Sequence, residues 1–151
     1  MVWYLSIDGV KALFEPKNVA VIGASRDPSK TGHIILRNII EAGFKGGIYP
    51  VNPKADKILG IKVYPNLKSI PEDIDLIVVV VPARIVPRVM EEAGEKGVKA
   101  AVIISGGFRE VGPEGAKLEH EVVSIARKYG IRFLGPNCQG VNNPHLGLCA
   151  S

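Results

Sequence analysis

The strongest constraint on the fold of this chain is a regular alternation of short apolar runs with helical patterns. In the run 76–81 every residue is leucine, isoleucine or valine. An unbroken run of this kind is typical of a strand with both faces buried, because a strand with one face in water alternates apolar with polar residues. Such strands occur in parallel sheets that helices cover on both sides. We expect strands over residues 18–23, 47–51, 76–81, 100–105 and 132–134.

Glycine and proline mark the ends of the helical patterns. Gly43 and Gly97 stand where a glycine in the left-handed conformation would end a helix. Pro87 falls in a first helical turn, where its missing N–H costs little. The surface excursion 58–65 is predicted to hold a small strand pair. We expect helices over residues 8–14, 30–42, 83–96 and 113–129.

These units together predict the fold class. Strands joined by right-handed helical crossovers build an α/β, Rossmann-like, doubly wound parallel sheet with helices on both faces. For the five strands, counted along the chain, we expect the order 3-2-1-4-5. Ligands of such sheets bind beyond the carboxyl ends of the strands. The loops that follow the strands are therefore where functional residues are expected.

The length of 151 residues fits one domain and leaves no room for a second complete one. Residues 1–151 are therefore expected to form a single domain. Residues 144–151 follow the last strand with no helix to cover them, and we expect them to lead into a further domain that this chain lacks. A hydrophobic fraction of 46% and a charged fraction of 23% are those of an ordinary soluble globular protein.

Charge and cysteine content narrow the partners and the compartment. The net charge of +4 is spread along the chain, and there are only four Phe, four Tyr and one Trp. Both facts argue against a nucleic-acid surface. Cys138 and Cys149 are too few to brace the chain, which suits a reducing cytoplasm. The longest apolar run, 76–81, is far too short to span a bilayer, and the start lacks the features of a signal peptide. We expect no membrane contact and no metal site.

The loop after the first strand has the features of a phosphate-binding loop. Gly23 lets the backbone approach an anion closely, and the free N–H groups at the start of the next helix attract one. Ser25 can donate a hydrogen bond, while Arg26 and Lys30 add positive charge. The glycines do not fit the Gly-x-Gly-x-x-Gly fingerprint, so an ordinary turn with surface charges remains an alternative.

The loop after the second strand indicates a phosphorylated ribose. In dinucleotide-binding folds an acidic residue here accepts a hydrogen bond from the ribose 2′-hydroxyl. This chain has Asn52, Pro53 and Lys54 instead. A lysine suits either the 2′-phosphate of NADP or the 3′-phosphate of coenzyme A. The alternative is a turn followed by a solvated lysine.

Two later loops carry weaker signals. Gly106 and Gly107 follow a buried strand, where successive N–H groups could form an anion-binding nest or simply a flexible strand exit. Cys138 lies at the same edge of the sheet. A cysteine nucleophile needs a base beside it, and none of the three histidines stands at a spacing recognised for such a pair. We predict that Cys138 packs beside a ligand and is not catalytic. His33, His120 and His145 are expected to have structural or surface roles.

Five motifs taken together resemble one known family, the N-terminal coenzyme A-binding domain of ADP-forming acetyl- or acyl-CoA synthetases, relatives of the succinyl-CoA synthetase α subunit. The motif Gly135-Pro136-Asn137-Cys138-Gln139-Gly140-Val141 is the most specific. The others are Val21-Ile22-Gly23-Ala24-Ser25, Tyr49-Pro50-Val51-Asn52-Pro53-Lys54, Val80-Val81-Pro82-Ala83 and Ile103-Ile104-Ser105-Gly106-Gly107-Phe108.

The resemblance implies a role for each loop in binding coenzyme A. Gly23, Ala24, Ser25 and the residues after them would hold the pyrophosphate. Val51 to Lys54 would hold the adenosine and its 3′-phosphate. Pro82 and the segment Ile104, Ser105 and Gly106 would line the path of the pantetheine. Asn137 and Cys138 would lie towards the thiol.

The resemblance also limits the expected activity. In the family the reaction passes through a phosphorylated histidine in a later domain and through ATP-grasp parts, and this chain matches neither. The resemblance therefore implies that this chain is the coenzyme A-binding domain of an ADP-forming acetate- or acyl-CoA ligase. Such a domain is not catalytic alone and works with ligase or ATP-grasp domains or subunits. Two alternatives stay open: a single-domain NADP-dependent oxidoreductase, and a free-standing CoA-binding regulatory or redox protein in which Cys138 forms a mixed disulfide with coenzyme A.

Overall fold

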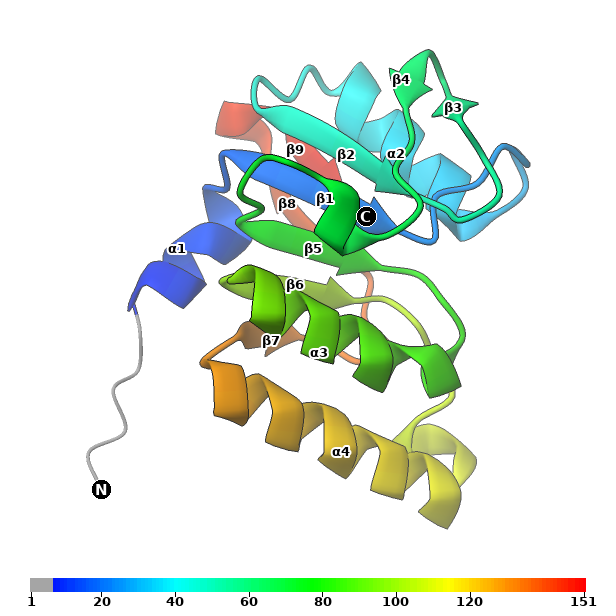
Figure 1. Ribbon diagram of the computed structural model, residues 1–151, viewed down its shortest axis with the longest axis vertical. Coiled ribbons are helices and arrows are strands. Elements are labelled where there is room, and N and C mark those ends of the chain that lie inside the picture. The colour runs from blue at the N-terminus through cyan, green and yellow to red at the C-terminus, as the bar shows by residue number, and fades with distance from the viewer. Residues whose placement is uncertain (1–6) are drawn as a thin grey trace.

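A five-stranded parallel sheet forms the centre of the protein, whose computed structural model describes residues 7–151 (Figure 1). Every neighbouring pair of strands in this sheet is parallel. The predicted sheet is therefore confirmed. The third and fourth predicted strands are two residues shorter than expected, and the first is one residue shorter. The strands are β1 (Asn18–Ile22), β2 (Gly47–Val51), β5 (Leu76–Val79), β6 (Ala100–Ile103) and β7 (Arg132–Leu134).

The predicted order of the strands is wrong in one respect. The sheet runs β2-β1-β5-β6-β7, which is 2-1-3-4-5 when the five strands are counted along the chain, not 3-2-1-4-5. β5 pairs with β1, with Val19 opposite Leu76, so β2 lies at the edge. This is the flavodoxin-like arrangement of the doubly wound fold.

The physical reason for the edge position lies in β2 itself. The outer side of β2 is covered by Tyr64, whose N–H donates to the carbonyl of Pro50 and whose carbonyl accepts from the N–H of Asn52, both at 3.0 Å. Pro50 has no N–H on that side to offer a further strand. Proline within a strand is confined to edges for this reason, so Pro50 was the sequence signal that β2 lies at an edge.

Helices cover both faces of the sheet, as predicted. On one face α3 (Val86–Lys96) and α4 (Pro113–Tyr129) pack on the side chains of Ala20 and Ile77. On the other face α1 (Ile7–Phe14) and α2 (Thr31–Glu41) pack on those of Val19 and Val21. Figure 1 shows α3 and α4 side by side in front of the sheet. Neighbouring residues of one strand thus serve two separate cores, which explains the unbroken apolar runs.

Short elements complete the fold. The predicted strand pair in the surface excursion is present as antiparallel β3 (Lys57–Ile58) and β4 (Ile61–Lys62). The helix expected from residue 83 begins with a 3₁₀ turn, η2 (Ala83–Ile85), before α3. No helix in the described part of the chain is long and apolar enough to cross a membrane.

The last residues form a hairpin on the α2 face of the sheet. β8 (Val141–Asn143) pairs with β9 (Leu148–Ala150), and the turn between them contains a 3₁₀ helix, η4 (Pro144–Leu146). Leu148 and Ala150 are buried, and the carbonyl of Ser151 accepts a hydrogen bond from Asn38 Nδ2 at 2.7 Å. The segment 144–151 thus packs on this domain; that it leads into a further domain stays a prediction.

Candidate functional site

The corrected strand order places a crevice between the ends of β1 and β5. The chain leaves β1 for α2 on one face and leaves β5 for α3 on the other (Figure 1). At such a switch point the two following loops diverge and leave a crevice where ligands of doubly wound sheets bind. The loops after all five strands meet this edge of the sheet.

Gly23 begins the first loop in a conformation that favours glycine. Its φ is 96°, and its N–H donates to the carbonyl of Val51 at 3.1 Å. Gly32, in the first turn of α2, lies directly against it: a Cβ added to Gly32 would stand 2.0 Å from the carbonyl oxygen of Gly23. The start of α2 is therefore held against the end of β1 by a contact that admits only glycine.

Internal hydrogen bonds hold the rest of this loop. Ser25 Oγ accepts from the N–H of Asp27 at 3.1 Å, which leaves its own O–H free to donate to a ligand. The Asp27 carboxylate accepts from Ser29 N–H and Oγ, and these two bonds lower the pKa of Asp27. Buried His33 approaches the carbonyl of Ser25 with Nδ1 at 2.9 Å. His33 thus has the structural role expected of it.

The two basic residues of the first loop differ in their freedom. Arg26 Nε donates to the carbonyl of Lys57 at 3.2 Å, so Arg26 ties the loop to the surface excursion. Lys30 is exposed at the N-cap of α2. Within residues 7–151 no ion pair or side-chain hydrogen bond holds Lys30, whose charge acts on nearby Asp27, while Arg26 would have to give up a hydrogen bond to reach a ligand.

Asn52 joins the first two loops. Its Nδ2 donates to the carbonyl of Ala24 at 2.7 Å, and its Oδ1 accepts from the N–H of Lys54 at 2.8 Å. Ala24 is fully buried, so it shapes the loop through its backbone. Pro53 and Lys54 are exposed beyond this turn. The sequence motif Asn52-Pro53-Lys54 is thus a turn, as one alternative held, and it also lies at the crevice.

A groove of about 400 Å³ runs along the crevice. Four of the predicted site residues line it: Gly23, Val51, Asn52 and Pro53. Most of its remaining wall is aliphatic and includes Leu67, Val81, Ile85 and Val89. Arg88 also lines the groove, and of these five residues only Val81 belongs to a motif that the sequence assigned to the site. The groove is suited to a flat, largely apolar group with polar atoms at its rim.

Hydrogen bonds also connect the three loops on the other side of the crevice. Ser105 Oγ donates to the carbonyl of Val81, and the carbonyl of Ser105 accepts from the N–H of Asn137 at 3.0 Å. Ile104 N–H donates to the carbonyl of Val79 at 3.0 Å, and exposed Pro82 opens the turn before α3. The structure thus brings the predicted residues of these loops to one edge.

A nest is present after β6, but it is formed by Gly107 and Phe108, not by the predicted pair Gly106 and Gly107, and a side chain of the same loop fills it. The N–H groups of Gly107 and Phe108 both donate to Glu110 Oε1, at 2.5 and 3.1 Å. The hydrogen bond from Gly107 is the main cause that lowers the pKa of Glu110. Gly106 is closely approached, because a Cβ added there would stand 3.2 Å from Glu110 Oε1 and 3.3 Å from Asn137 Oδ1. The N–H groups of Gly107 and Phe108 therefore hold the loop in place and do not face a ligand.

Cys138 is half-buried beside β6, with Sγ donating to the carbonyl of Ile103 at 3.4 Å. Burial raises the pKa of the Cys138 thiol. A higher pKa leaves less thiolate at neutral pH, and the thiolate is the reactive form. We therefore expect Cys138 to alkylate at pH 7.5 more slowly than a free thiol, with a rate that rises into the alkaline range. Iodoacetamide labelling of a Cys149→Ser variant, followed by mass spectrometry, measures this rate. Labelling as fast as that of a free thiol would contradict the assignment.

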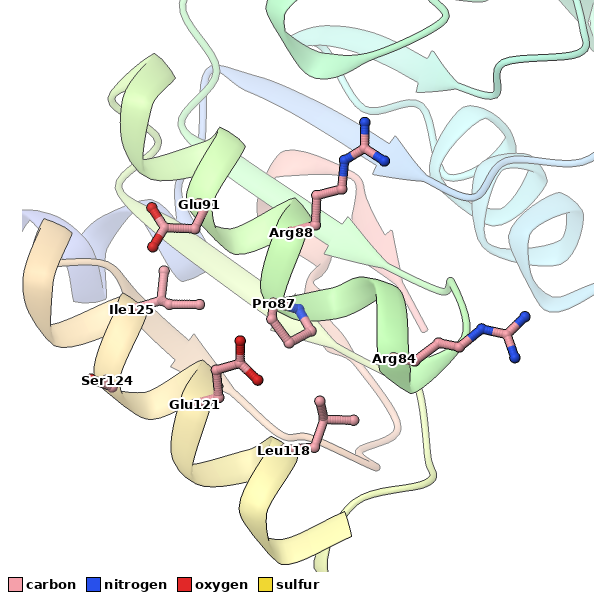
Figure 2. A pocket seen from close by; sticks show the side chains of 8 residues that line it. All are labelled: Arg84, Pro87, Arg88, Glu91, Leu118, Glu121, Ser124 and Ile125. Carbon is pink, nitrogen blue, oxygen red and sulfur yellow. The ribbon is translucent and has the colours of Figure 1, made fainter. Parts of the chain in front are cut away.

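A second groove, of about 550 Å³, lies between α3 and α4. Figure 2 shows Pro87, Leu118 and Ile125 between the two helices, with Glu91 and Glu121 beside them. It does not lie over the ends of the strands, and the charges of Arg84 and Arg88 in its lining are balanced by Glu91 and Glu121. This groove is therefore a poorer candidate for a phosphorylated ligand than the crevice.

Comparison with known proteins gives consistent matches. Residues 17–144 match the model of the CoA binding domain family. The chain is 51% identical over 146 residues to acetate–CoA ligase [ADP-forming] II of Archaeoglobus fulgidus, covering 97% of this chain and 22% of that protein. It is 54% identical over 136 residues to the alpha subunit of acetate–CoA ligase [ADP-forming] I of Pyrococcus furiosus, covering 87% and 29%.

Solved structures agree with the sequence matches. The structure of PH0766 from Pyrococcus horikoshii OT3 superposes with a TM-score of 0.90 at 48% identity, over 94% of this chain and 32% of that one. A dinucleotide forming acetyl-coenzyme A synthetase 1 from Ca. Korarchaeum cryptofilum, in complex with phosphate and ADP, superposes with a TM-score of 0.91 at 45% identity. The match covers 96% of this chain and 31% of that one. The chain thus spans less than a third of the length of each of these four proteins.

Proposed function

Since this chain belongs to the CoA binding domain family, we propose that it binds coenzyme A across the carboxyl edge of its sheet, as the CoA-binding part of an ADP-forming acyl-CoA ligase. The observation that carries this proposal is the groove at the switch point between β1 and β5. Its aliphatic walls fit a nucleotide base, and the Gly23 loop beside it fits a pyrophosphate.

The geometry supports an assignment of the parts of coenzyme A to the loops. The adenosine would lie in the groove beside Val51, Asn52 and Pro53. The pyrophosphate would meet the Gly23–Ser25 backbone, the free hydroxyl of Ser25 and Lys30. The pantetheine would follow the turn at Pro82 and the Ile104, Ser105 and Gly106 segment. Its end would lie near Asn137 and Cys138, and the bound cofactor would supply a thiol there that accepts an acyl group.

We further propose that the chain binds coenzyme A without catalysing acyl transfer by itself. It spans less than a third of the ligases that it resembles, so activation of the acid would rest with ligase or ATP-grasp domains or subunits. The raised pKa of Cys138 weighs against the alternative of a redox protein that forms a mixed disulfide at this residue.

Replacing Lys54 with alanine tests the part of this proposal that concerns the 3′-phosphate. If Lys54 contacts that phosphate, the variant should lose about 1.5 to 3 kcal/mol of binding energy towards coenzyme A, the range of a charge-assisted hydrogen bond. Dephospho-CoA, which lacks the phosphate, should bind both proteins equally. Isothermal titration calorimetry measures all four affinities.

Lys45→Ala is the matched control, because it removes the same charge from an exposed position just before β2, at the opposite edge of the sheet. Equal affinity of the unaltered protein for coenzyme A and dephospho-CoA would contradict the proposal that Lys54 contacts the 3′-phosphate. No binding of either ligand, together with binding of NADP, would favour the oxidoreductase alternative over coenzyme A.

A further inference from the structure

Arg88 is a basic residue of the groove that the sequence motifs did not identify. It lies in the first turn of α3, is exposed, and lines both the groove at the switch point and the groove between α3 and α4. Figure 2 shows its side chain leaving α3 on the side away from α4, while Pro87 points into the space between the two helices. The guanidinium of Arg88 is therefore directed away from the α3–α4 packing.

The guanidinium of Arg88 has no partner within the described residues 7–151, whereas other basic residues of these two helices do. Lys128 pairs with Glu91 at 3.3 Å, and Lys96 Nζ donates to the carbonyl of Ile70 at 2.5 Å. Glu92, one turn after Arg88, also lines the groove, but its Oε1 accepts from the N–H of Lys68 at 2.9 Å. Arg88 is thus a cation at the groove that is free to meet an anion.

The rest of the groove determines where an anion could lie. Its walls are mainly aliphatic and suit a base, whereas a phosphate buried among such side chains would lose its hydration without gaining hydrogen bonds. A phosphate on the ribose would therefore stay at the rim. Two cations, Arg88 and Lys54, are candidates to meet this phosphate. Arg88 lines the groove, whereas Lys54 lies beyond the Asn52 turn and does not line it.

We propose that Arg88 binds the phosphate on the ribose of the nucleotide end of the ligand and so sets the preference of the site for a ribose-phosphorylated nucleotide. This inference rests on the proposed function. Its chemistry follows from the guanidinium, whose planar fork can donate two parallel hydrogen bonds to one phosphate. Lys54 would contact the same phosphate as a single point charge from the other side.

Arg88→Met tests the inference, because methionine keeps a long apolar stem but removes the charge. Titration with coenzyme A should show an affinity loss between about tenfold and a hundredfold. The affinity for dephospho-CoA should stay within about twofold of that of the unaltered protein. Arg84→Met is the matched control: Arg84 is exposed on the turn before α3 and shares the groove between α3 and α4 with Arg88, but it does not line the groove at the switch point, so it should change neither affinity.

Each other outcome overturns the inference in a recognisable way. An equal loss for both ligands would mean that Arg88 supports the base or the fold, and no loss for either would mean that it does not contact the ligand. In both cases the unaltered protein still binds coenzyme A, and the proposed function stands. Absence of coenzyme A binding by the unaltered protein would overturn both proposals together.

Discussion

Replacing Gly32 with alanine is expected to destabilise this protein by about 3 kcal/mol or more, since forcing extra atoms into a packed site typically costs 1–3 kcal/mol and here the obstacle is backbone. The added Cβ would stand 2.0 Å from the carbonyl oxygen of Gly23 and 2.9 Å from its carbonyl carbon. Neither atom belongs to a side chain that could rotate away. α2 and the end of β1 would have to separate.

The consequences of this substitution should extend to the binding site. The Gly23 carbonyl and the Gly23 N–H belong to the same residue, and that N–H holds the first loop against Val51. A shift at Gly23 would disturb both loops to which the proposal assigns the pyrophosphate and the adenosine. We expect coenzyme A binding to be lost even under conditions where the variant is still folded.

Urea denaturation followed by circular dichroism measures the stability change. Gly43→Ala is the control, because a Cβ there meets no atom within 4 Å and its cost arises only from a φ of 75°, about 1–2 kcal/mol. A Gly32→Ala variant that unfolds at the same urea concentration as the unaltered protein would show that the close approach of α2 is not needed.

Phe108→Ala is expected to cost about 3–5 kcal/mol, the usual range for removing a large aromatic side chain from a core. Phe108 is fully buried in the core between the sheet and the helices α3 and α4. It is also the residue that anchors the loop after β6, because Gly106 and Gly107 before it have no side chains to pack. Since domains of this size are stable by only about 5–15 kcal/mol, the variant should be close to unfolding.

Thermal unfolding followed by differential scanning calorimetry measures this effect. Val111→Ala is the matched control three residues further on, where the side chain is 66% exposed and the cost should lie within about 0.5 kcal/mol. If Phe108→Ala cost no more than Val111→Ala, the loop after β6 would not depend on its aromatic anchor.

The sequence predicted most of the local structure correctly. Gly97 ends α3 in the left-handed conformation with a φ of 86°, and Pro113 begins α4 at the predicted residue. Such signals succeed because a cap or a first turn depends only on residues a few positions apart. The predicted ends of β5 and β6 were less accurate. Val80, Val81, Ile104 and Ser105 continue the two strand patterns in sequence, but in the structure they lie in the loops that reach the crevice.

The candidate site was predicted only in part for a related reason. Gly23, Val51, Asn52 and Pro53 belong to motifs that follow strands, and they do line the groove. Arg88 belongs to no motif, and its position at the groove follows only from the way α3 packs. Asn52 was predicted as a site residue, with a turn as the alternative, but its hydrogen bond to Ala24, 28 residues away in the chain, was not predicted.

By itself, then, the sequence determined the parallel sheet, the helices on its two faces, the glycine-started loop and the family resemblance, because each of these is written in residues close together along the chain. Pro50 marks β2 as an edge strand, but only the tertiary structure decided that β5 lies beside β1 and that Arg88 lies at the same groove as Val51 and Asn52. Strand order and side-chain convergence depend on hydrogen bonds and packing between distant segments, and a local pattern does not encode them.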